Sequence, residues 1–339
     1  MFAASEGLFG LGTAAALAIG ALRFHAGALS IGAVYLIFQY AQLLRRPAEQ
    51  IRNEVQELQQ ADAGLNRIEA LFGLAPQLVD GPGAALPAGP LSVEFDGVSF
   101  GYEADAPVLR DIDLRLAPGR VLGVVGRTGD GKTTLTRLLT RFHDPQAGEV
   151  RLGGVDLRDV RLAAVRARVG LVSQDVHIFH ATVRDNLTLF DDRVADDRIV
   201  AALDEAGLGD WLRTLPRGLD TLLGGDAALS AGQAQTLACA RLFLSDPDVV
   251  ILDEPSSRLD PATERQLHAA LGRLLAGRTA IVVAHRLSTI AYADDVLVLE
   301  DGQVREFGPR LALAADPTSR FAALLRIAGA DIAAEEAVL

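Results

Sequence analysis

Residues 126–133 read Gly126-Arg127-Thr128-Gly129-Asp130-Gly131-Lys132-Thr133, which is the glycine-rich phosphate loop G-x-x-x-x-G-K-[ST]. The loop follows an apolar run at 121–125, which reads as a strand. It is followed by residues 134–139, beginning with Thr134, which read as a helix. We therefore predict that the loop joins a strand to a helix. Backbone N–H groups of such a loop close around phosphate oxygens. We therefore expect Lys132 to reach the β- and γ-phosphates of a nucleotide and the Thr133 hydroxyl to bind Mg²⁺.

Further apolar runs predict an α/β fold with a buried, parallel sheet. The runs 249–252 and 280–284 are continuous, as in strands that are buried on both faces. The first delivers the pair Asp253-Glu254 at its carboxyl end, and the second delivers His285. Ligands of open α/β sheets collect at the carboxyl ends of strands, so the loop, the carboxylates and the histidine are expected to converge on one crevice. Alternation at 111–116 predicts a small β lobe before this core.

Composition limits the classes of function. A chain of 339 residues suggests about two domains. The net charge of −12 and the lack of a Lys/Arg cluster argue against a nucleic-acid partner. The single Cys239 excludes a disulfide within the chain, and its apolar helical surroundings predict a buried packing role. This cysteine usage fits a reducing, cytosolic face for the soluble part of the chain.

The first 75 residues are predicted to be a membrane piece. The 21 residues of 24–44 lack Asp, Glu, Lys and Arg and would span about 32 Å as a helix, enough to cross a bilayer. The uncharged run 7–22 would reach only about 24 Å, so it is predicted as a partial helix. Arg45 and Arg46 place the chain after them in the cytoplasm. Helical spacing over 48–74 predicts a cytosolic extension, and the Pro/Gly-rich segment 76–90 a linker. A buried hairpin in a soluble protein is the alternative for the two apolar runs.

An ordered set of motifs resembles the nucleotide-binding domain of ATP-binding-cassette (ABC) transporters, and residues 1–75 resemble the end of an exporter's transmembrane domain. The motifs are Tyr102, the phosphate loop, Gln174, the signature Leu229-Ser230-Ala231-Gly232-Gln233, Asp253-Glu254, Asp260 and His285. The resemblance implies a P-loop NTPase domain over 91–328, with a β lobe and a helical subdomain at about 175–244, followed by a tail at 329–339.

The resemblance also implies roles for these residues. Glu254 is the candidate general base, His285 would contact the γ-phosphate, and Gln174 would meet Mg²⁺ and the attacking water. Asp253 suits Mg²⁺ because that ion demands oxygen ligands, so Thr133, Gln174 and Asp253 form the expected metal set. Tyr102 would stack on adenine. The nucleotide-binding set is then Tyr102 with Gly126, Arg127, Thr128, Gly129, Asp130, Gly131, Lys132, Thr133 and Thr134.

In this family the signature segment completes the ATP site of a partner domain. Residues 229–233 and Asp260 would therefore act on the opposite subunit, where a helix starting after Ser230 aims N–H groups at the γ-phosphate. Hydrolysis is expected to need a dimer with two ATP molecules held head to tail. Closure on ATP and opening after hydrolysis would then drive the membrane helices.

Three residues depart from the family pattern. Asp130 puts a carboxylate in the phosphate loop, which is expected to repel phosphate unless it points to solvent. Ala231 adds a methyl group where glycine normally lets the backbone approach closely. Gly225 stands where exporters often carry glutamate before the signature. These uneven motifs favour a heterodimer with non-equivalent sites over a homodimer.

The leading hypothesis is the ATPase portion of an ABC exporter in the plasma membrane, with a second nucleotide-binding domain, further membrane helices and lipid as partners. Each half of an exporter in this family has six membrane helices, whereas this chain is predicted to have one full and one partial helix. The chain is therefore expected to be a truncated product, a domain excerpt, or a chain whose remaining helices are encoded separately. One alternative is a regulatory half that closes on ATP with little turnover, which Asp130, Ala231 and Gly225 favour. Another is an ABC ATPase of nucleic-acid metabolism, which the run 24–44 disfavours. The transported substrate is not determined by the sequence.

Overall fold

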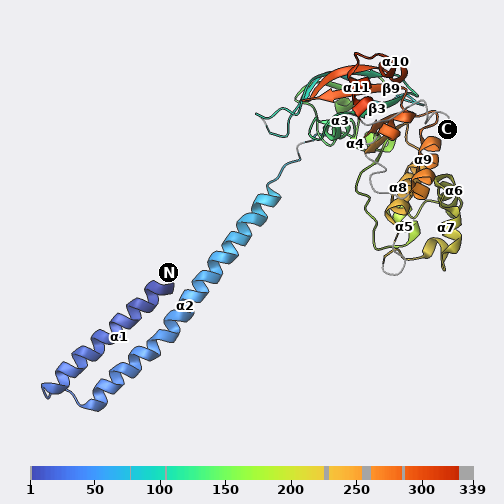
Figure 1. Cartoon of the computed structure of the whole chain (residues 1–339). Coiled ribbons are helices and arrows are strands. Elements are labelled where there is room, and N and C mark those ends of the chain that lie inside the picture. Colours follow the sequence, from blue (N-terminus) through green and yellow to red (C-terminus); the bar gives the residue numbers. More distant parts are fainter. Residues whose placement is uncertain are drawn as a thin grey trace. The chain divides into compact units, whose positions relative to one another are not determined.

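The computed structural model describes residues 2–76, 78–103, 105–224, 229–253, 261–284 and 287–327. It divides the chain into two compact units, Met1–Pro76 and Gln77–Leu339 (Figure 1). Three predicted site residues, Glu254, Asp260 and His285, lie outside the described residues, as do Gly225 and the predicted tail at 329–339.

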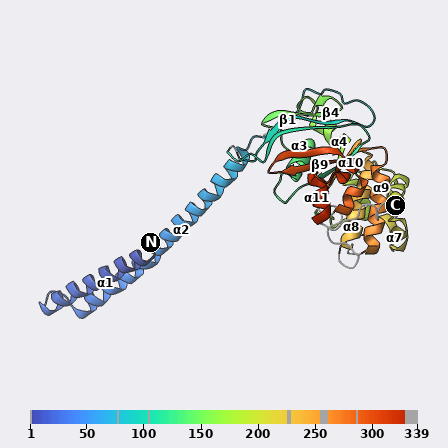
Figure 2. The ribbon, with the colours of Figure 1, turned by 45° about the horizontal axis from the view of Figure 1, so that its top comes forward.

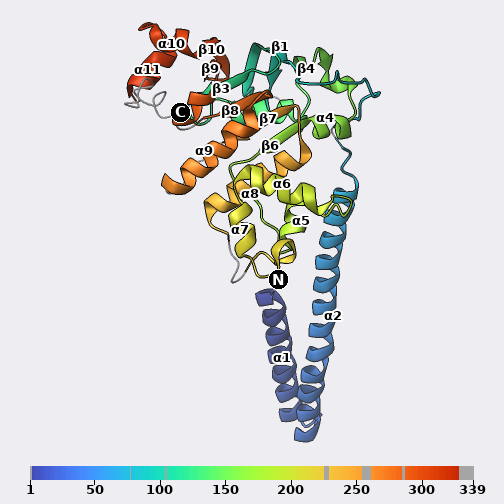
Figure 3. The same ribbon diagram turned by 90° about the vertical axis from the view of Figure 1, so that its right-hand side faces the viewer.

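The first unit is a hairpin of two helices, α1 (Phe2–His25) and α2 (Ile31–Phe72), which lie side by side (Figure 3). The turn between them uses Gly27 at φ +66°, and the Ser30 side chain caps α2 by accepting the N–H of Ala33 at 3.3 Å. Helix α2 continues through Pro47 without a break. A proline in a helix removes one backbone hydrogen bond, and the long helix tolerates this loss.

The helix predicted over 24–44 is therefore corrected. The turn at 26–30 divides the apolar run, so residues 24 and 25 end α1, while residues 31–44 form the start of α2 together with the predicted extension. A left-handed glycine followed by a serine cap ends one helix and begins the next, a local signal that the count of uncharged residues ignored. Within the described part of the chain, no helix has both the length and the apolar character that crossing a membrane requires.

The second unit begins with the predicted β lobe, an antiparallel sheet in the order β2-β1-β4-β5. Its strands are β1 (Val93–Phe100), β2 (Leu109–Leu116), β4 (Ala147–Leu152) and β5 (Val155–Asp156). Buried and exposed residues alternate along β2, as the sequence predicted. The inward side chains, such as Phe95 and Ile112, share one core with residues of the second sheet.

The second sheet has the order β10-β9-β3-β8-β7-β6, and every pairing is parallel except that of β10. The strands are β3 (Val121–Val125), β6 (Val169–Val172), β7 (Val249–Asp253), β8 (Thr279–Val283), β9 (Asp295–Glu300) and β10 (Gln303–Pro309). Hydrophobic clusters cover both of its faces, which confirms the prediction of strands buried on both sides. Helices α3 (Lys132–Leu139), α4 (Leu162–Arg168), α9 (Pro261–Leu275), α10 (Arg310–Ala315) and α11 (Arg320–Ile327) and the short 3₁₀ helices Leu157–Asp159 and Leu287–Tyr292 accompany it.

The predicted helical subdomain is present between β6 and β7. It comprises α5 (Val183–Thr188), α6 (Asp196–Ala206), α7 (Gly209–Thr214), a 3₁₀ turn at Gly218–Asp220 and α8 (Ala231–Ser245). These elements enclose a hydrophobic core of their own, which includes Ile199, Leu203 and Leu237. The subdomain and the β lobe lie at opposite ends of the unit (Figure 2). Cys239 is fully buried on α8, as predicted.

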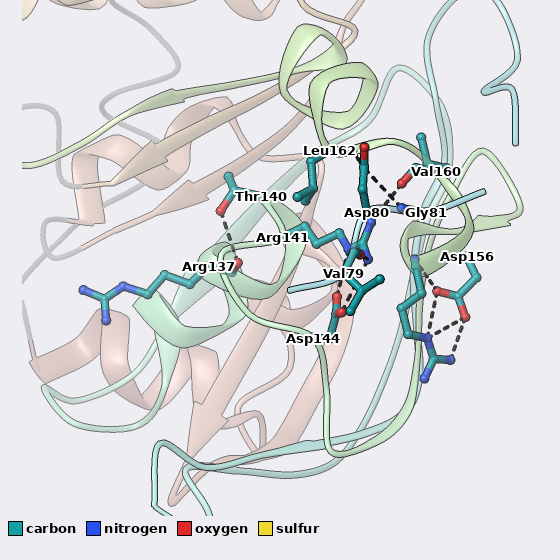
Figure 4. A network of polar contacts seen from close by, with 11 residues as sticks. Val79, Asp80, Gly81, Arg137, Thr140, Arg141, Asp144, Asp156, Val160 and Leu162 are labelled. Carbon is teal, nitrogen blue, oxygen red and sulfur yellow. Dashed lines mark hydrogen bonds and ion pairs between the residues drawn. The ribbon is translucent and has the colours of Figure 1, made fainter. Parts of the chain in front are cut away.

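Most of the predicted linker is fixed to the second unit. We call residues 79–89 the strap. Its Val79 carbonyl accepts a 2.8 Å hydrogen bond from Arg141 Nη2, and Asp80 Oδ1 accepts the N–H of Leu162 at 2.7 Å (Figure 4). A Cβ at Gly81 would lie 2.5 Å from the carbonyl oxygen of Val160, so only glycine fits there. The segment thus lacks regular secondary structure, as expected, but it packs closely onto the domain.

Candidate nucleotide-binding site

The phosphate loop joins the end of β3 to the start of α3, as the sequence predicted. Gly129 and Gly131 adopt φ +96° and +98°, a left-handed conformation that glycine reaches without strain. Gly131 is also the N-cap of α3, and a Cβ there would lie 2.6 Å from Leu109 Cδ2. The first N–H groups of a helix have no partner within the helix, and they carry the positive end of its dipole. The loop therefore presents an anion-binding helix end.

Lys132 lies across this loop. Its side chain is 4% exposed, and Nζ donates to the carbonyl oxygens of Gly126 at 2.7 Å and Arg127 at 2.8 Å. Thr133, the next residue, is exposed in the first turn of α3. The ammonium group and the helix end thus provide positive charge at the same loop.

Asp130 does not point to solvent, which was the arrangement expected to relieve its repulsion of phosphate. It is 8% exposed, and its Oδ2 accepts a short hydrogen bond from the N–H of Arg127. Its Oδ1 accepts the N–H of Asp301 at 3.3 Å. The carboxylate is therefore part of the internal hydrogen bonding of the loop.

Tyr102 follows β1 and is tied to the loop helix. Its hydroxyl forms a 3.2 Å hydrogen bond with Thr134 Oγ1 and accepts a 3.0 Å bond from Arg137 Nη1. The ring is 47% exposed, and the Arg137 guanidinium lies 5.8 Å from its centroid. His143 packs edge-on against the ring at 5.4 Å. A partly exposed aromatic ring is thus oriented by contacts with α3.

Arg137 and His143 were missed in the sequence analysis. Arg137 follows Thr134 at i+3, so both were predictable neighbours on one face of the helix. His143 had no such signal, because it lies beyond the end of α3 and meets Tyr102 only through the fold.

Gln174 and Asp253 lie at the same edge of the sheet as the loop. Asp253 is the last residue of β7 and pairs with Val283 of β8, which in turn pairs with Val124 of β3. Because β8 lies between β7 and β3, the Cα atom of Asp253 is two strand spacings, or about 10 Å, from β3. Gln174 is exposed just after β6, the next strand in the sheet. Ala284 ends the described part of the chain before the predicted His285.

The predicted metal ligands at this edge of the sheet all offer oxygen atoms, the donor type that Mg²⁺ prefers. The predicted set provides a hydroxyl from Thr133, an amide from Gln174 and a carboxylate from Asp253. Across the described ranges we find no cluster of three or more His, Cys, Asp or Glu residues that could hold a metal ion alone. Mg²⁺ usually takes one or two carboxylates, with phosphate oxygens and water completing its shell, so this donor set fits.

The signature segment lies in the helical subdomain. Ser230 caps α8: its hydroxyl accepts the N–H of Gln233 at 3.1 Å, and Gln233 Oε1 accepts the N–H of Ser230 at 3.0 Å. Leu229 packs on the subdomain core, Ala231 is the first residue of α8, and Gly232 is buried. Helix α8 packs mainly on α6, α9, α5 and β6, whereas α3 packs on β8. The signature thus belongs to a different part of the domain from the phosphate loop.

Comparisons with known proteins agree with this geometry. Residues 109–257 match the family model described as ABC transporter. The ATP-dependent lipid A-core flippase of Syntrophus aciditrophicus is 37% identical over 312 residues, which is 91% of this chain and 52% of that protein. The mycobactin import ATP-binding/permease protein of Mycolicibacterium smegmatis is 46% identical over 217 residues, 64% of this chain and 25% of that protein.

A solved structure extends the likeness to nearly the whole chain. The structure of a bacterial Atm1-family ABC exporter with ATP bound matches with a TM-score of 0.72 and 31% identity, over 97% of this chain and 57% of that one. This chain spans about half the length of the flippase relatives, 52% and 49% in two cases. The matches and the fold together show that the chain carries the ATPase domain of the ABC transporter family.

Proposed function

We propose that this chain is the ATP-hydrolysing half of an ABC exporter, in which closure of two nucleotide-binding domains on ATP drives substrate efflux across a membrane. The observation that carries the proposal is the phosphate loop at the start of α3, with Tyr102 bonded to the same helix through Thr134. One helix would thereby position both the phosphate and the adenine contacts.

ATP binding would start from the positive end of α3. The N–H groups of the first turn would receive the phosphates, and Lys132 would exchange its carbonyl partners, Gly126 and Arg127, for phosphate oxygens. Adenine would stack on the exposed face of Tyr102. The remaining loop residues, Thr128 and Gly129, would surround the phosphates with backbone.

Hydrolysis would use groups at the carboxyl ends of the strands. Glu254 would take the proton of the attacking water as general base, because it directly follows Asp253 at the end of β7. His285 would contact the γ-phosphate, and Gln174 would orient the water. Mg²⁺ bound with the nucleotide, held by Thr133, Gln174 and Asp253, would supply charge neutralisation for the phosphates.

A second nucleotide-binding domain would complete each site. Ser230 caps α8, which packs on other elements than the helix of its own phosphate loop, so we assign residues 229–233, with Asp260, to the ATP of a partner subunit. The N-terminal end of α8 would aim its dipole at that γ-phosphate. Ala231 and Gly225 depart from the family pattern, which favours a heterodimer of non-equivalent sites over a homodimer.

The helical hairpin supports a membrane setting. Large apolar side chains are exposed along α1 and the first part of α2, including Leu11, Leu22, Ile31 and Leu43. Exposed apolar patches of this kind mark surfaces that other apolar groups cover. We assign lipid and further transmembrane helices to this cover. From Arg45 and Arg46 we also propose that the ATPase domain faces the cytoplasmic side of the plasma membrane. The relatives carry different named cargoes, so the cargo is left unassigned.

The test is ATP hydrolysis by the purified chain over a series of protein concentrations, beside Glu254→Gln and Lys132→Ala. Activity that rises more than linearly with concentration and is lost in both variants supports a dimeric ATPase with Glu254 as base. ATP binding without hydrolysis, also after addition of a competent partner domain, would instead favour a regulatory half that closes on ATP with little turnover.

Mixing two inactive variants tests the head-to-tail assignment. In a mixed dimer of Lys132→Ala and Ser230→Ala chains, one site has both defects and the other has neither. Recovery of activity on mixing supports sites shared between subunits. Because Ser230 caps α8, the thermal unfolding of the Ser230→Ala chain is the control for its fold. If mixing folded variants restores nothing although the wild type is active, the shared site is wrong.

A further inference from the structure

We propose that Asp130 is a positioning residue that holds the phosphate loop in its nucleotide-receptive shape through two backbone hydrogen bonds. This inference rests on the proposed function, because it concerns the affinity of the same loop for ATP. It replaces the expectation, drawn from charge alone, that a carboxylate at this position weakens binding by repelling phosphate.

The first bond closes the loop on itself. Asp130 Oδ2 accepts the N–H of Arg127, while the Arg127 carbonyl oxygen accepts the N–H of Asp130 at 3.2 Å and Lys132 Nζ at 2.8 Å. Arg127 is thus held at both ends of its backbone. When Lys132 turns to phosphate, its contact with this carbonyl is lost, but the bonds between Asp130 and Arg127 are not. Asp130 therefore keeps the loop shaped while the lysine changes partners.

The second bond ties the loop to the turn between β9 and β10. Asp130 Oδ1 accepts the N–H of Asp301, which adopts φ +48° in that turn. The turn is itself fixed: the Gly302 carbonyl oxygen accepts the N–H of Arg110 at 2.8 Å, and a Cβ at Gly302 would lie 2.1 Å from Val108 O. The loop is thus anchored to a neighbour that has little room to move.

The direction of the carboxylate follows from close packing at the start of the loop. A Cβ at Gly126 would lie 2.4 Å from Leu299 O and 2.9 Å from Asp130 Oδ2. The glycine leaves room for the carboxylate beside it, where its two oxygens accept the N–H groups of Arg127 and Asp301. Two backbone donors satisfy it there, as burial of a charged group requires.

The experiment measures the dissociation constant of ATP with magnesium for the wild type, Asp130→Ala, Asp130→Asn and Lys132→Ala. The matched control is Asp113→Ala, since Asp113 Oδ1 also accepts a backbone N–H, that of Gly97 at 2.9 Å, but in the β lobe. Loss of both bonds in Asp130→Ala is expected to weaken binding about tenfold or more. Asparagine can retain the bond to Arg127 but not both bonds, so Asp130→Asn should fall between. Asp113→Ala should bind like the wild type.

Hydrolysis gives the readout that general loss of structure would not produce. With saturating ATP the ligand orders the loop, so Asp130→Ala should keep kcat within about twofold while its KM rises as binding weakens. Wild-type affinity in Asp130→Ala, or tighter binding in Asp130→Asn than in the wild type, would overturn the proposal, the latter because repulsion would then dominate. A wild type that does not bind ATP, or a Lys132→Ala variant that binds equally well, would instead refute the nucleotide site itself.

Discussion

Arg141 reaches across 62 residues of sequence to donate a 2.8 Å hydrogen bond from Nη2 to the carbonyl oxygen of Val79. The side chain is 2% exposed, and it also donates to Val160 O at 2.8 Å and to Asp144 Oδ1 at 2.9 Å. Arg141 follows the end of α3 by two residues and has a left-handed backbone at φ +50°. One buried guanidinium thus joins the strap to the helix that begins with the phosphate loop (Figure 4).

Replacement of Arg141 by alanine should destabilise the domain strongly. The change removes the donor from the buried carbonyl oxygen of Val160, from the part-buried carbonyl oxygen of Val79 and from the Asp144 carboxylate, so we expect a loss of about 2–4 kcal/mol in the free energy of unfolding. Denaturant unfolding of the purified chain measures it. The control is Arg213→Ala, because the pair Arg213 and Asp210 is largely exposed and surface ion pairs contribute little. Equal midpoints for the two variants would contradict a structural role for Arg141.

Tyr102 should contribute to affinity through its ring rather than its hydroxyl. Stacking of a base on an aromatic ring is worth about 1–3 kcal/mol, so Tyr102→Ala is expected to weaken ATP binding by about 5- to 150-fold. Tyr102→Phe loses only the bonds to Thr134 and Arg137 and should stay within a few-fold of the wild type. Inorganic triphosphate, which has no base, is the ligand control. If Tyr102→Ala weakened triphosphate equally, the residue would act on the loop and not on adenine.

The hydroxyl of Ser230 has two separable roles in our proposals, as a helix cap and as a contact with the ATP of a partner. Ser230→Ala should cost about 1 kcal/mol of stability, whereas Ser230→Gly, which suits an N-cap, should cost only a few tenths. Both variants should lose ATPase activity, because neither retains the hydroxyl. Thermal unfolding and hydrolysis measured on the same samples separate the roles. Full ATPase activity in Ser230→Gly would show that the Ser230 hydroxyl does not contact the partner's ATP and acts only as a helix cap.

Cys239 should react only when the domain opens. Burial raises the pKa of its thiol from 9.0 to about 12, so the reactive thiolate is disfavoured in the folded state. Alkylation should therefore follow unfolding, as measured by mass spectrometry across a denaturant series. The unfolded chain loses this proton at lower pH than the folded chain, so this group lowers stability as the pH rises from 9.0 toward about 12. Rapid labelling under native conditions would show that α8 exposes the thiol.

Short-range signals allowed much of the domain to be predicted. Val249 to Leu252 read as a buried strand, and β7 covers them with Asp253 at its carboxyl end. The loop, its flanking strand and helix, and the β lobe were also placed correctly, because apolar periodicity and glycine spacing act over a few residues. The helical subdomain was expected only from the resemblance to ABC nucleotide-binding domains. The break between α1 and α2 was predicted at residue 23, between the two uncharged runs, whereas the structure places it at residues 26–30. The count of uncharged residues gave Gly27 and Ser30 no weight, although together they end one helix and cap the next.

By itself, the sequence determined that a glycine-rich phosphate loop at residues 126–133 joins a strand to a helix and that Asp253 ends a buried strand at the same sheet edge, because these features depend on neighbours along the chain. Only the tertiary structure decided where Asp130 points, what holds Tyr102, and that the strap is packed against Arg141. Those outcomes depend on groups that are remote in sequence, such as Asp301 for Asp130 and Val79 for Arg141. Hydrogen bonds between such groups form only when the fold has brought their donors and acceptors together, so no local pattern encodes them.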